Sequence, residues 1–372
     1  MERILVEEGN TRFFVPVQDE HSAFPPSTAR IFYNRRMELN RDATVLFVSI
    51  TGPEDYLDSM GATGARGIRV ASECGIPVTI NDRDPVAADW IRENAAQSGE
   101  GITVTCANLH TLLSVQRFDA VDLDPYGSPA PFIDSAIRGT KRFLLVTATD
   151  TAPLCGAHRK AGIRRYFAQA LNNEYHAETG LRTLLGFVIR EAVKYDRGIR
   201  PVFCFSREHY VRAHFLLAPG AGQADAAVAR IGFIHQCSRC PQRSEQQGIL
   251  PDSEPCAACG GPTIPIGPLW LGEIQDRKIL DAMIGRLPGQ CLRTAPELMT
   301  LLKILKEELP TSSFYDYHHL ARDAKISPGP ITDLVAGLRE AGYQASRVHY
   351  TGTGIKTDAQ AEVILTMMQQ ES

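Results

Sequence analysis

The sequence predicts an α/β protein built on a doubly wound parallel sheet, with a cysteine-bearing insertion and a smaller C-terminal α+β domain. Two observations predict the sheet: strand and helix patterns alternate from residue 55 onward, and most strand patterns are continuous apolar runs. Such strands belong to parallel sheets that helices cover on both faces. A third observation is the length of 372 residues, which predicts two or more domains because one ordinary core would not hold it.

The composition is that of a globular protein without a membrane span. Hydrophobic residues make up 44% and charged residues 22% of the chain. No run approaches the roughly 18 apolar residues of a spanning helix, and the start lacks a signal-peptide apolar region, so we expect a cytoplasmic protein. A net charge of −4 means that any nucleic-acid binding has to come from local patches.

The first half of the predicted sheet begins at a short strand over 55–60. A glycine-rich turn follows and leads into a helix over 64–74. A second helix is expected over 85–96, with Asp84 as its N-cap and Pro85 at its first position. Three further strands are expected over 77–80, 102–105 and 118–123.

The second half of the sheet follows along the chain. A fifth strand is expected over 142–149. Apolar residues at spacings of three and four predict a helix over 181–193. Two closing strands, over 201–205 and 210–218, would bring the sheet to about seven strands. The segment 219–227 contains glycine and proline and is predicted to be an exposed loop.

The turn after the first strand has the features of a cofactor loop. Asp58 ends the strand, and Gly61 and Gly64 let the backbone approach a ligand closely. Asp82 lies about twenty residues further on, where a carboxylate can accept ribose hydroxyls. This pattern fits a dinucleotide or S-adenosylmethionine. Against a nicotinamide dehydrogenase, no tyrosine is followed four positions later by lysine, the pair that one large dehydrogenase class uses.

The stretch "DLDPYGSP" after the fourth strand carries candidate catalytic residues. In a doubly wound sheet Asp124, Pro125 and Tyr126 would lie beside the cofactor loop. Transfer to an exocyclic base nitrogen needs such residues: the carboxylate accepts an amino hydrogen, the proline carbonyl is a second acceptor, and the ring stacks on the base. The alternative is a proline–glycine turn whose aspartates cap the next helix.

The nine cysteines fall into two groups. Four have the C-x2-C spacing twice, separated by fifteen residues, as in a structural zinc ribbon: Cys237, Cys240, Cys256 and Cys259. The alternative is two unrelated pairs of buried thiols, which the polar intervening segment disfavours. The other five are expected to be small core residues: Cys74, Cys106, Cys155, Cys204 and Cys291.

The C-terminal part is predicted to be a small α+β or winged-helix-like domain. The segment 265–270 resembles a linker or entry turn. Helices are expected over 296–308 and 330–341, and a strand over 345–350. The predicted division is a cofactor-binding domain over 1–232, a zinc-ribbon-like segment over 233–264, and a C-terminal domain over 265–372.

Two basic clusters are candidates for phosphate contacts. The first, over 29–42, places arginines around two aromatic rings: Arg30, Arg35, Arg36 and Arg41 around Phe32 and Tyr33. The second, over 158–167, is expected on a helix and contains His158, Arg159, Lys160, Arg164 and Arg165. Charge runs are usually solvated faces, and the interleaved aromatic residues favour a functional role for the first cluster.

These motifs together resemble one known family, the tRNA guanine-26 N2-dimethyltransferases of archaea and eukaryotes. The resemblance runs from about residue 2 to about residue 365 and is carried by "FYNRRMELNRD", "GATGARGIR", "DLDPYGSPAPFIDSAIRG", "VTATDTAPLCGAH", "KYDRGI", "GPLWLG" and "IKTDA". It implies a class I methyltransferase fold, S-adenosylmethionine as donor, tRNA as partner, and transfer of one or two methyl groups to the N2 atom of a guanosine.

The resemblance also implies roles for individual residues. Arg36 and Arg66 match donor-contacting arginines, and Asp82 matches the acidic position on the ribose side. Cys106 and Ala107 align near the adenine-side loop, although the family often has an acidic residue where Cys106 stands. The structural zinc ion is predicted from the cysteine spacing and not from the resemblance, and no obligate protein partner is evident.

The same resemblance assigns the catalytic stretch. Asp124 would be the catalytic carboxylate and Tyr126 the base-stacking ring, where phenylalanine is more usual. Two other functions remain open: an amino-methyltransferase acting on another RNA or on DNA, and a non-catalytic RNA-binding protein on a methyltransferase scaffold. The intact Asp124 and glycine turn argue against the second.

Overall fold

A computed structural model describes residues 2–17 and 31–370. The chain divides into two compact units, and each unit takes up three separate chain segments. Unit 1 contains Met1–Thr147, His214–Leu217 and Arg277–Lys303; unit 2 contains Ala148–Ala213, Ala218–Asp276 and Ile304–Ser372. Among the described helices, none combines the length and apolar character that a bilayer crossing requires.

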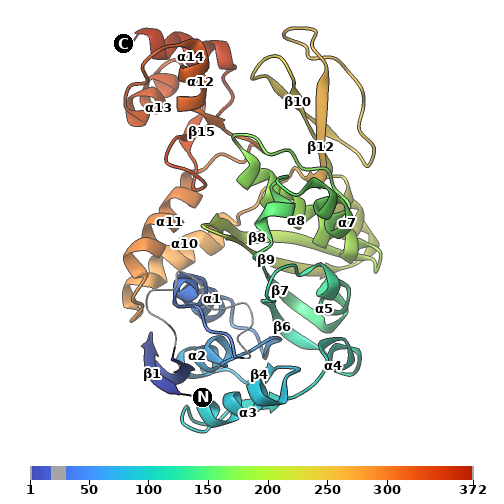
Figure 1. The fold of residues 1–372 in the computed structure, drawn as a ribbon, viewed down its shortest axis with the longest axis vertical. Helices are drawn as coiled ribbons and strands as arrows, with labels where there is room; N and C mark the ends of the chain where they lie inside the picture. The colour runs from blue at the N-terminus through green and yellow to red at the C-terminus, as the bar shows by residue number, and fades with distance from the viewer. Residues whose placement is uncertain (1, 18–30, 371–372) are drawn as a thin grey trace. The chain divides into compact units, whose positions relative to one another are not determined.

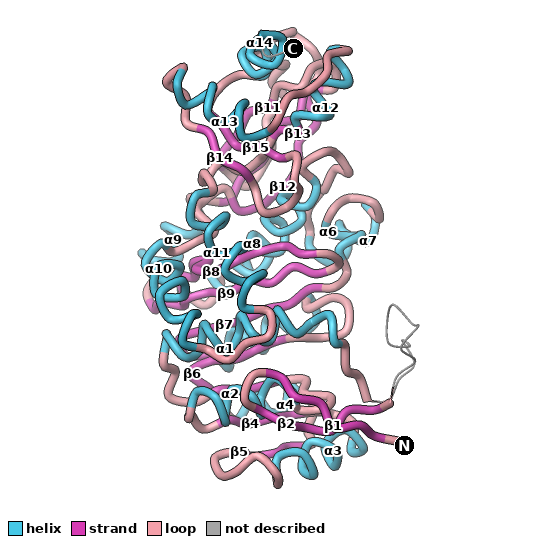
Figure 2. The backbone as a smooth tube through the Cα atoms, turned by 90° about the vertical axis from the view of Figure 1, so that its left-hand side faces the viewer, coloured by secondary structure: helices cyan, strands magenta, loops and turns pink. Residues whose placement is uncertain are grey.

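The central sheet has the predicted seven strands in the order β5-β4-β3-β6-β7-β9-β8 (Figure 2). The strands are β3 (Tyr56–Asp58), β4 (Val78–Asn81), β5 (Ile102–Thr105), β6 (Phe118–Leu123), β7 (Thr140–Ala148), β8 (Arg197–Arg207) and β9 (Tyr210–Pro219). The strands β3 to β7 pair in parallel, with Leu57 opposite Thr79 and Val121, and Leu123 opposite Val146. This order is that of a class I methyltransferase fold, as the resemblance implies.

The helices of unit 1 lie around these strands (Figure 1). They are α1 (Glu38–Thr51), α2 (Ala65–Cys74), α3 (Pro85–Ala95), α4 (Leu109–Val115), α5 (Ile133–Gly139) and α10 (Arg277–Arg286), with a short 3-10 turn, η1, over Arg35–Met37. As predicted, the Asp84 carboxylate caps α3 by accepting the Val86 N–H at 2.9 Å, and Pro85 occupies the first turn. An antiparallel hairpin of β1 (Arg3–Glu8) and β2 (Thr11–Pro16), which the sequence patterns did not predict, completes the unit.

Unit 2 contains further helices and two small sheets. Its helices are α6 (Thr151–Leu154), α7 (Arg159–Tyr166), α8 (His176–Val193), α9 (Ala221–Val228), α12 (Tyr317–Ala324), α13 (Ile331–Glu340) and α14 (Ala361–Gln370). One three-stranded antiparallel sheet has the order β11-β10-β12, with bounds Arg243–Gln247, Ile231–Cys237 and Thr263–Trp270. A second has the order β13-β15-β14, with bounds Tyr315–Asp316, Gly354–Thr357 and Ala345–Arg347. The helix α11 (Ala295–Glu307) begins in unit 1 and ends in unit 2.

Three expectations from the sequence are wrong. The segment 219–227 is mostly the helix α9 rather than a loop, because Ala224 and Ala227 pack inward and alanine favours helices. The segment 265–270 belongs to β12 rather than to a linker; β12 is an edge strand, where proline needs no N–H for pairing. Cys106 and Cys291 are exposed rather than core residues, since both lie in loops.

Candidate functional site

The glycine turn after β3 lies at the carboxyl ends of neighbouring parallel strands. A Cβ atom at Gly61 would lie 2.4 Å from Cγ2 of Ile80, and Gly64 has a φ of +81°, so both positions require glycine. The Gly61 N–H donates to the Asn81 carbonyl at 2.8 Å, which holds the turn against the end of β4. Because Gly61 and Gly64 have no side chains, a ligand can approach the backbone of this turn closely, at the sheet edge where α/β proteins bind ligands.

Asp82 lies against this turn, as the spacing predicts. Its Oδ2 accepts the Ala62 N–H at 3.0 Å, and its Oδ1 accepts the Asp84 N–H at 2.9 Å. Each carboxylate oxygen has a further lone pair, so the side chain can still accept hydroxyl donors.

Asn81 has a structural role that the sequence analysis did not assign. Its buried amide donates to the carbonyls of Ser59 at 3.2 Å and Ala107 at 3.1 Å, and its Oδ1 accepts the Ala107 N–H at 3.1 Å. This side chain thus fixes the loop after β5, including Ala107 and the exposed Cys106, beside the glycine turn. An asparagine at a strand end gives no motif by which this role could have been found.

Arg66 connects the glycine turn with the candidate catalytic stretch. Its Nη2 pairs with the Asp124 carboxylate, and its Nη1 donates to Asn40 Oδ1 at 2.8 Å and Thr44 Oγ1 at 2.7 Å. Burial lowers the pKa of Arg66, but Asp122 and Asp124 outweigh it and raise the pKa above its ordinary value. The guanidinium is 6% exposed and the Asp124 side chain 22% exposed. The buried Arg66 therefore fixes the position of the Asp124 carboxylate, which is still partly accessible to solvent.

Asp58 is a further carboxylate of the site and, unlike Asp82 and Asp124, it is buried. Its Oδ2 accepts the Gly67 N–H at 2.9 Å. Burial raises the pKa of Asp58 to about 7; Arg66 lowers it, and the charges of Asp122 and Asp124 raise it further. With this pKa, Asp58 changes its charge near neutral pH. Its hydrogen bond to Gly67 places it next to the start of α2.

Tyr126 is exposed on the loop that follows β6. Its side chain is 72% exposed, and its ring makes an edge contact with Phe32, with 5.7 Å between centroids. Phe32 lies shortly before η1, the short 3-10 turn that contains Arg36, and the Arg36 side chain is exposed. The contact between Phe32 and Tyr126 places the start of the first basic cluster beside the loop that follows β6.

The first basic cluster does not act as one surface. Arg35 is exposed, as Arg36 is, and Arg30 lies outside the described residues. Arg41 is buried, and its Nε and Nη2 donate to the Glu8 carboxylate at 2.7 Å and 2.5 Å. Arg41 is thus a partner of a buried acid rather than a phosphate contact.

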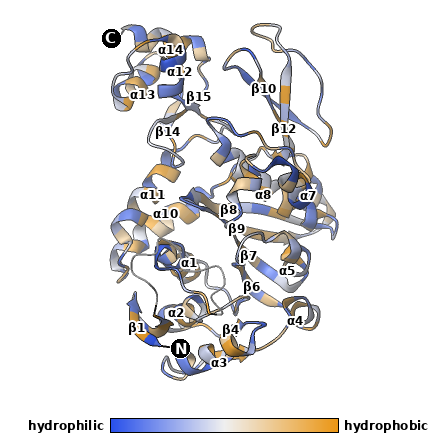
Figure 3. Cartoon of the chain, viewed as in Figure 1, coloured by the Kyte–Doolittle hydropathy of each residue, from blue (hydrophilic) through white to orange (hydrophobic). Residues whose placement is uncertain are grey.

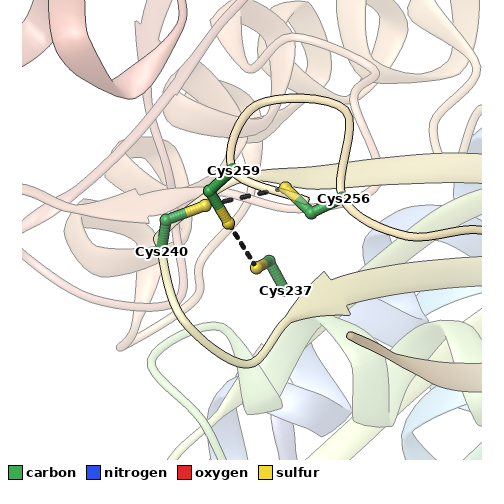
Figure 4. A group of neighbouring side chains, drawn as sticks. All are labelled: Cys237, Cys240, Cys256 and Cys259. Carbon is green, nitrogen blue, oxygen red and sulfur yellow. Dashed lines mark hydrogen bonds between the residues drawn. The ribbon is translucent and has the colours of Figure 1, made fainter. Parts of the chain in front are cut away.

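The four predicted cysteine ligands meet in unit 2 (Figure 4). The Sγ atoms of Cys237, Cys240, Cys256 and Cys259 all lie within 4.8 Å of one another, and two pairs lie 3.5 Å and 3.7 Å apart. Four thiolates about 2.3 Å from one zinc ion stand roughly 3.8 Å apart in a tetrahedron. The cluster has the size of a closed structural zinc site.

Comparisons with known proteins cover almost the whole chain. The family model described as N2,N2-dimethylguanosine tRNA methyltransferase matches residues 9–369. The tRNA (guanine(26)-N(2))-dimethyltransferase of Methanoregula boonei is 59% identical over 364 residues, with 98% of this chain and 97% of that protein covered. The protein of the same name from Methanosphaerula palustris is 56% identical, with all of both chains covered. The structure of Trm1 from Pyrococcus horikoshii with S-adenosyl-L-methionine is 34% identical, has a TM-score of 0.89, and covers 98% of this chain and 99% of its own.

Proposed function

Because the chain belongs to the N2,N2-dimethylguanosine tRNA methyltransferase family, we propose that it methylates the exocyclic N2 of guanosine 26 in tRNA, with S-adenosylmethionine as donor. It is an enzyme, and its product is the N2-methylated or N2,N2-dimethylated guanosine. We place its activity in the cytoplasm. The observation that carries the proposal is the pairing of Arg66, at the start of α2, with Asp124, at the end of β6, beside the glycine turn.

The residues of the turn and its neighbours fit the donor. S-adenosylmethionine supplies an electrophilic methyl group when it is bound. The bare backbone of Gly61 and Gly64 admits the donor closely, and Asp82 keeps acceptor capacity for ribose hydroxyls. The remaining proposed donor contacts are Asp58, Arg36, Arg66, Cys106 and Ala107, of which the last is held in place by Asn81.

The residues after β6 act on the guanine. The Asp124 carboxylate accepts one N2 hydrogen, the Pro125 carbonyl accepts the other, and the Tyr126 ring stacks on the base. These contacts direct the N2 lone pair toward the methyl carbon. As the N–C bond forms, the bond between the methyl carbon and the donor sulfur breaks and S-adenosylhomocysteine leaves. The nitrogen becomes positively charged and releases one proton to Asp124. An aromatic amine is a weak nucleophile, so orientation supplies most of the acceleration.

The other segments have supporting roles in this proposal. Residues 1–232 form the catalytic segment, 233–264 hold a structural zinc ion, and 265–372 contribute to RNA binding. The four cysteines leave no open position on a tetrahedral metal, so the zinc ion takes no part in methyl transfer.

The test is mass spectrometry of nucleosides from an unmodified tRNA transcript incubated with the protein and labelled S-adenosylmethionine. Labelled N2-methylguanosine and N2,N2-dimethylguanosine are expected. A transcript with adenosine at position 26 is the matched control and should take up no label. Label on another nucleoside, or equal label on both transcripts, would contradict the assigned substrate.

A further inference from the structure

The second basic cluster forms an exposed helix that the proposed active site does not use. The helix α7 has four cationic side chains and no acidic one: Arg159, Lys160, Arg164 and Arg165. All four are exposed, and Figure 3 colours this helix mainly as hydrophilic. Arg159 donates to Gln169 Oε1 at 2.7 Å, and Arg165 pairs with Asp150 at 2.9 Å. No ion pair or hydrogen bond joins the side chains of Lys160 and Arg164 to any described residue.

An aromatic ring is exposed directly after this helix. Phe167 is 71% exposed and ends the helix with a φ of +49°, its N–H donating to the Ile163 carbonyl at 3.0 Å. A left-handed residue that ends a helix is usually glycine, because a side chain there is strained. Phe167 therefore combines an unfavourable backbone conformation with an apolar ring in water. Neither feature stabilises the fold.

The charges at the other end of α7 are also unfavourable for the isolated helix. Arg159 and Lys160 lie in its first turn, where the helix dipole repels cations, and no side chain caps that end. A bound polyanion would remove this repulsion. Two features that cost stability in the free protein, the cations at the start of α7 and the exposed Phe167 ring, thus become favourable on one type of ligand, an RNA strand with phosphates and an accessible base.

The helix is nevertheless held rigidly on unit 2. A Cβ atom at Gly162 would lie 2.6 Å from the Pro153 carbonyl oxygen, so α7 packs directly on the backbone of α6. The buried Tyr166 donates its O–H to Asp150 at 2.6 Å, and its carbonyl accepts Arg190 Nη2 at 2.7 Å. The exposed cations and Phe167 are therefore presented on a fixed support rather than on a mobile tail.

We propose that α7 and Phe167 form a tRNA-contact surface, in which Lys160 and Arg164 bind backbone phosphates and the Phe167 ring stacks on an unpaired base. This inference rests on the proposed function, which supplies the tRNA. Phosphate contacts from cations combined with stacking on an aromatic ring are how proteins bind unpaired nucleotides. The loop with Asp124 and Tyr126 belongs to unit 1, whereas α7 and Phe167 belong to unit 2.

The first test measures tRNA binding without donor, by fluorescence anisotropy over a range of salt concentrations. Lys160→Ala/Arg164→Ala should raise Kd about tenfold at low salt and reduce the slope of log Kd against log salt by about 2, because two phosphate contacts are lost. Arg117→Ala/Arg230→Ala removes the same charge from two exposed positions outside both basic clusters and outside residues 265–372, and should leave both values unchanged. An equal loss in this control, or no loss in the α7 pair, would overturn the proposal.

The second test uses Phe167→Gly. It should raise Kd about 5- to 100-fold with the salt slope unchanged, while Tm stays equal or rises because glycine relieves the left-handed strain. A lower Tm with unchanged tRNA binding would show a packing role and overturn the stacking assignment. A single-stranded DNA of the same length that binds as tightly, and loses as much in these variants, would overturn tRNA as the partner.

The two proposals fail in distinguishable ways. If the α7 variants bind tRNA more weakly but the wild-type protein methylates no tRNA, the proposed reaction is wrong and the tRNA-contact surface is supported. If every variant methylates tRNA with an unchanged KM, the surface is wrong and the reaction stands.

Discussion

At the scale of single residues, the proposed reaction depends on the pair of Asp124 and Arg66, because Asp124 is the proposed acceptor for the N2 hydrogen. Arg66 is itself fixed by Asn40 and Thr44, so the Asp124 carboxylate has few alternative positions. Asp124→Ala should lower kcat by about 100-fold or more, because a positioned proton acceptor contributes about that much. Isothermal titration with S-adenosylmethionine is the control and should give a Kd within a few fold of the wild type. Retained methyl transfer, measured as labelled nucleoside, would exclude Asp124 as the acceptor.

Tyr126 should act through its ring rather than its hydroxyl. Tyr126→Phe is therefore expected to keep kcat/KM within about twofold, whereas Tyr126→Ala should lower it about 5- to 100-fold, the usual range for one lost stacking contact. Steady-state kinetics with varied tRNA separates the two variants. Equal losses in both would indicate that the hydroxyl, and not the stacking surface, is needed.

The motif residues were predictable from the sequence because their chemistry is specific to their types. Asp82 lies against the glycine turn as its spacing indicated, and the four cysteines meet as their spacing indicated. Asn40 and Thr44 were not predictable as partners of Arg66, because amides and hydroxyls inside a helix have no spacing rule that points to a distant side chain.

At the scale of elements, the hairpin β1–β2 depends on one buried acid. Glu8, whose side chain is 1% exposed, accepts hydrogen bonds from Arg41, Arg69 and Tyr33. Burial alone would raise the pKa of Glu8, but Arg41 and Arg69 hold it at about 2, below the ordinary 4.5. The folded protein thus favours the charged form, so this stabilisation is complete above pH 4.5 and is lost as the pH falls toward 2.

Glu8→Gln should lower the free energy of unfolding at pH 7 by about 3–5 kcal/mol, because it leaves buried cations without their charged partner. Glu7→Gln is the matched control: its partner Arg12 is exposed, and the loss should stay below about 1 kcal/mol. Urea titrations at pH 7 and pH 3 measure both. The difference in the free energy of unfolding between wild type and Glu8→Gln should be smaller at pH 3 than at pH 7. An equal difference at both pH values would show that the charge of Glu8 is not the cause.

The zinc ribbon gives a second prediction at this scale. Each wild-type chain should contain one tightly held zinc ion, and Cys240→Ser should lose it and lower Tm, since structural zinc contributes to folding. Cys291→Ser, at an exposed cysteine outside the cluster, should keep both the metal and the Tm. Metal analysis together with thermal melts checks this. Metal-free wild-type protein with a normal melt would refute the zinc site.

Elements with strong periodicity or caps were predictable, and those defined by tertiary packing were not. The apolar stripe of α8 and the Asp84 cap of α3 appear where expected. The hairpin β1–β2 was missed because β1 ends in the buried Glu8, whose partners Tyr33, Arg41 and Arg69 lie far along the chain. The strand β12 was missed because its prolines are tolerated only at an edge, which no local pattern reveals.

At the scale of the whole molecule, the chain crosses between the two units several times. Residues 277–303 return to unit 1, where α10 packs on α1. There Arg293 pairs with Glu38, and the Thr294 hydroxyl donates to Asp42 at 2.6 Å. Glu38 and Asp42 are 3% and 0% exposed, so both depend on a segment more than 200 positions later in the chain.

A fragment that ends at residue 232 should therefore fail to fold, although the sequence suggests that boundary. The fragment would lack α10, which packs on α1, and would leave Glu38 and Asp42 without the partners Arg293 and Thr294. Thermal melts by circular dichroism and titration with S-adenosylmethionine test it against the full chain. A cooperative melt with donor binding in the fragment would show that residues 277–303 are dispensable for unit 1.

The late return of this segment also has a consequence during translation. Domains usually fold as they leave the ribosome, beginning with the N-terminal one. Here the N-terminal unit must wait for α10, so nascent α1 keeps an uncovered apolar face while most of the chain is being synthesised. We therefore expect ribosome pausing before residue 277 to prolong the time during which the growing polypeptide can aggregate.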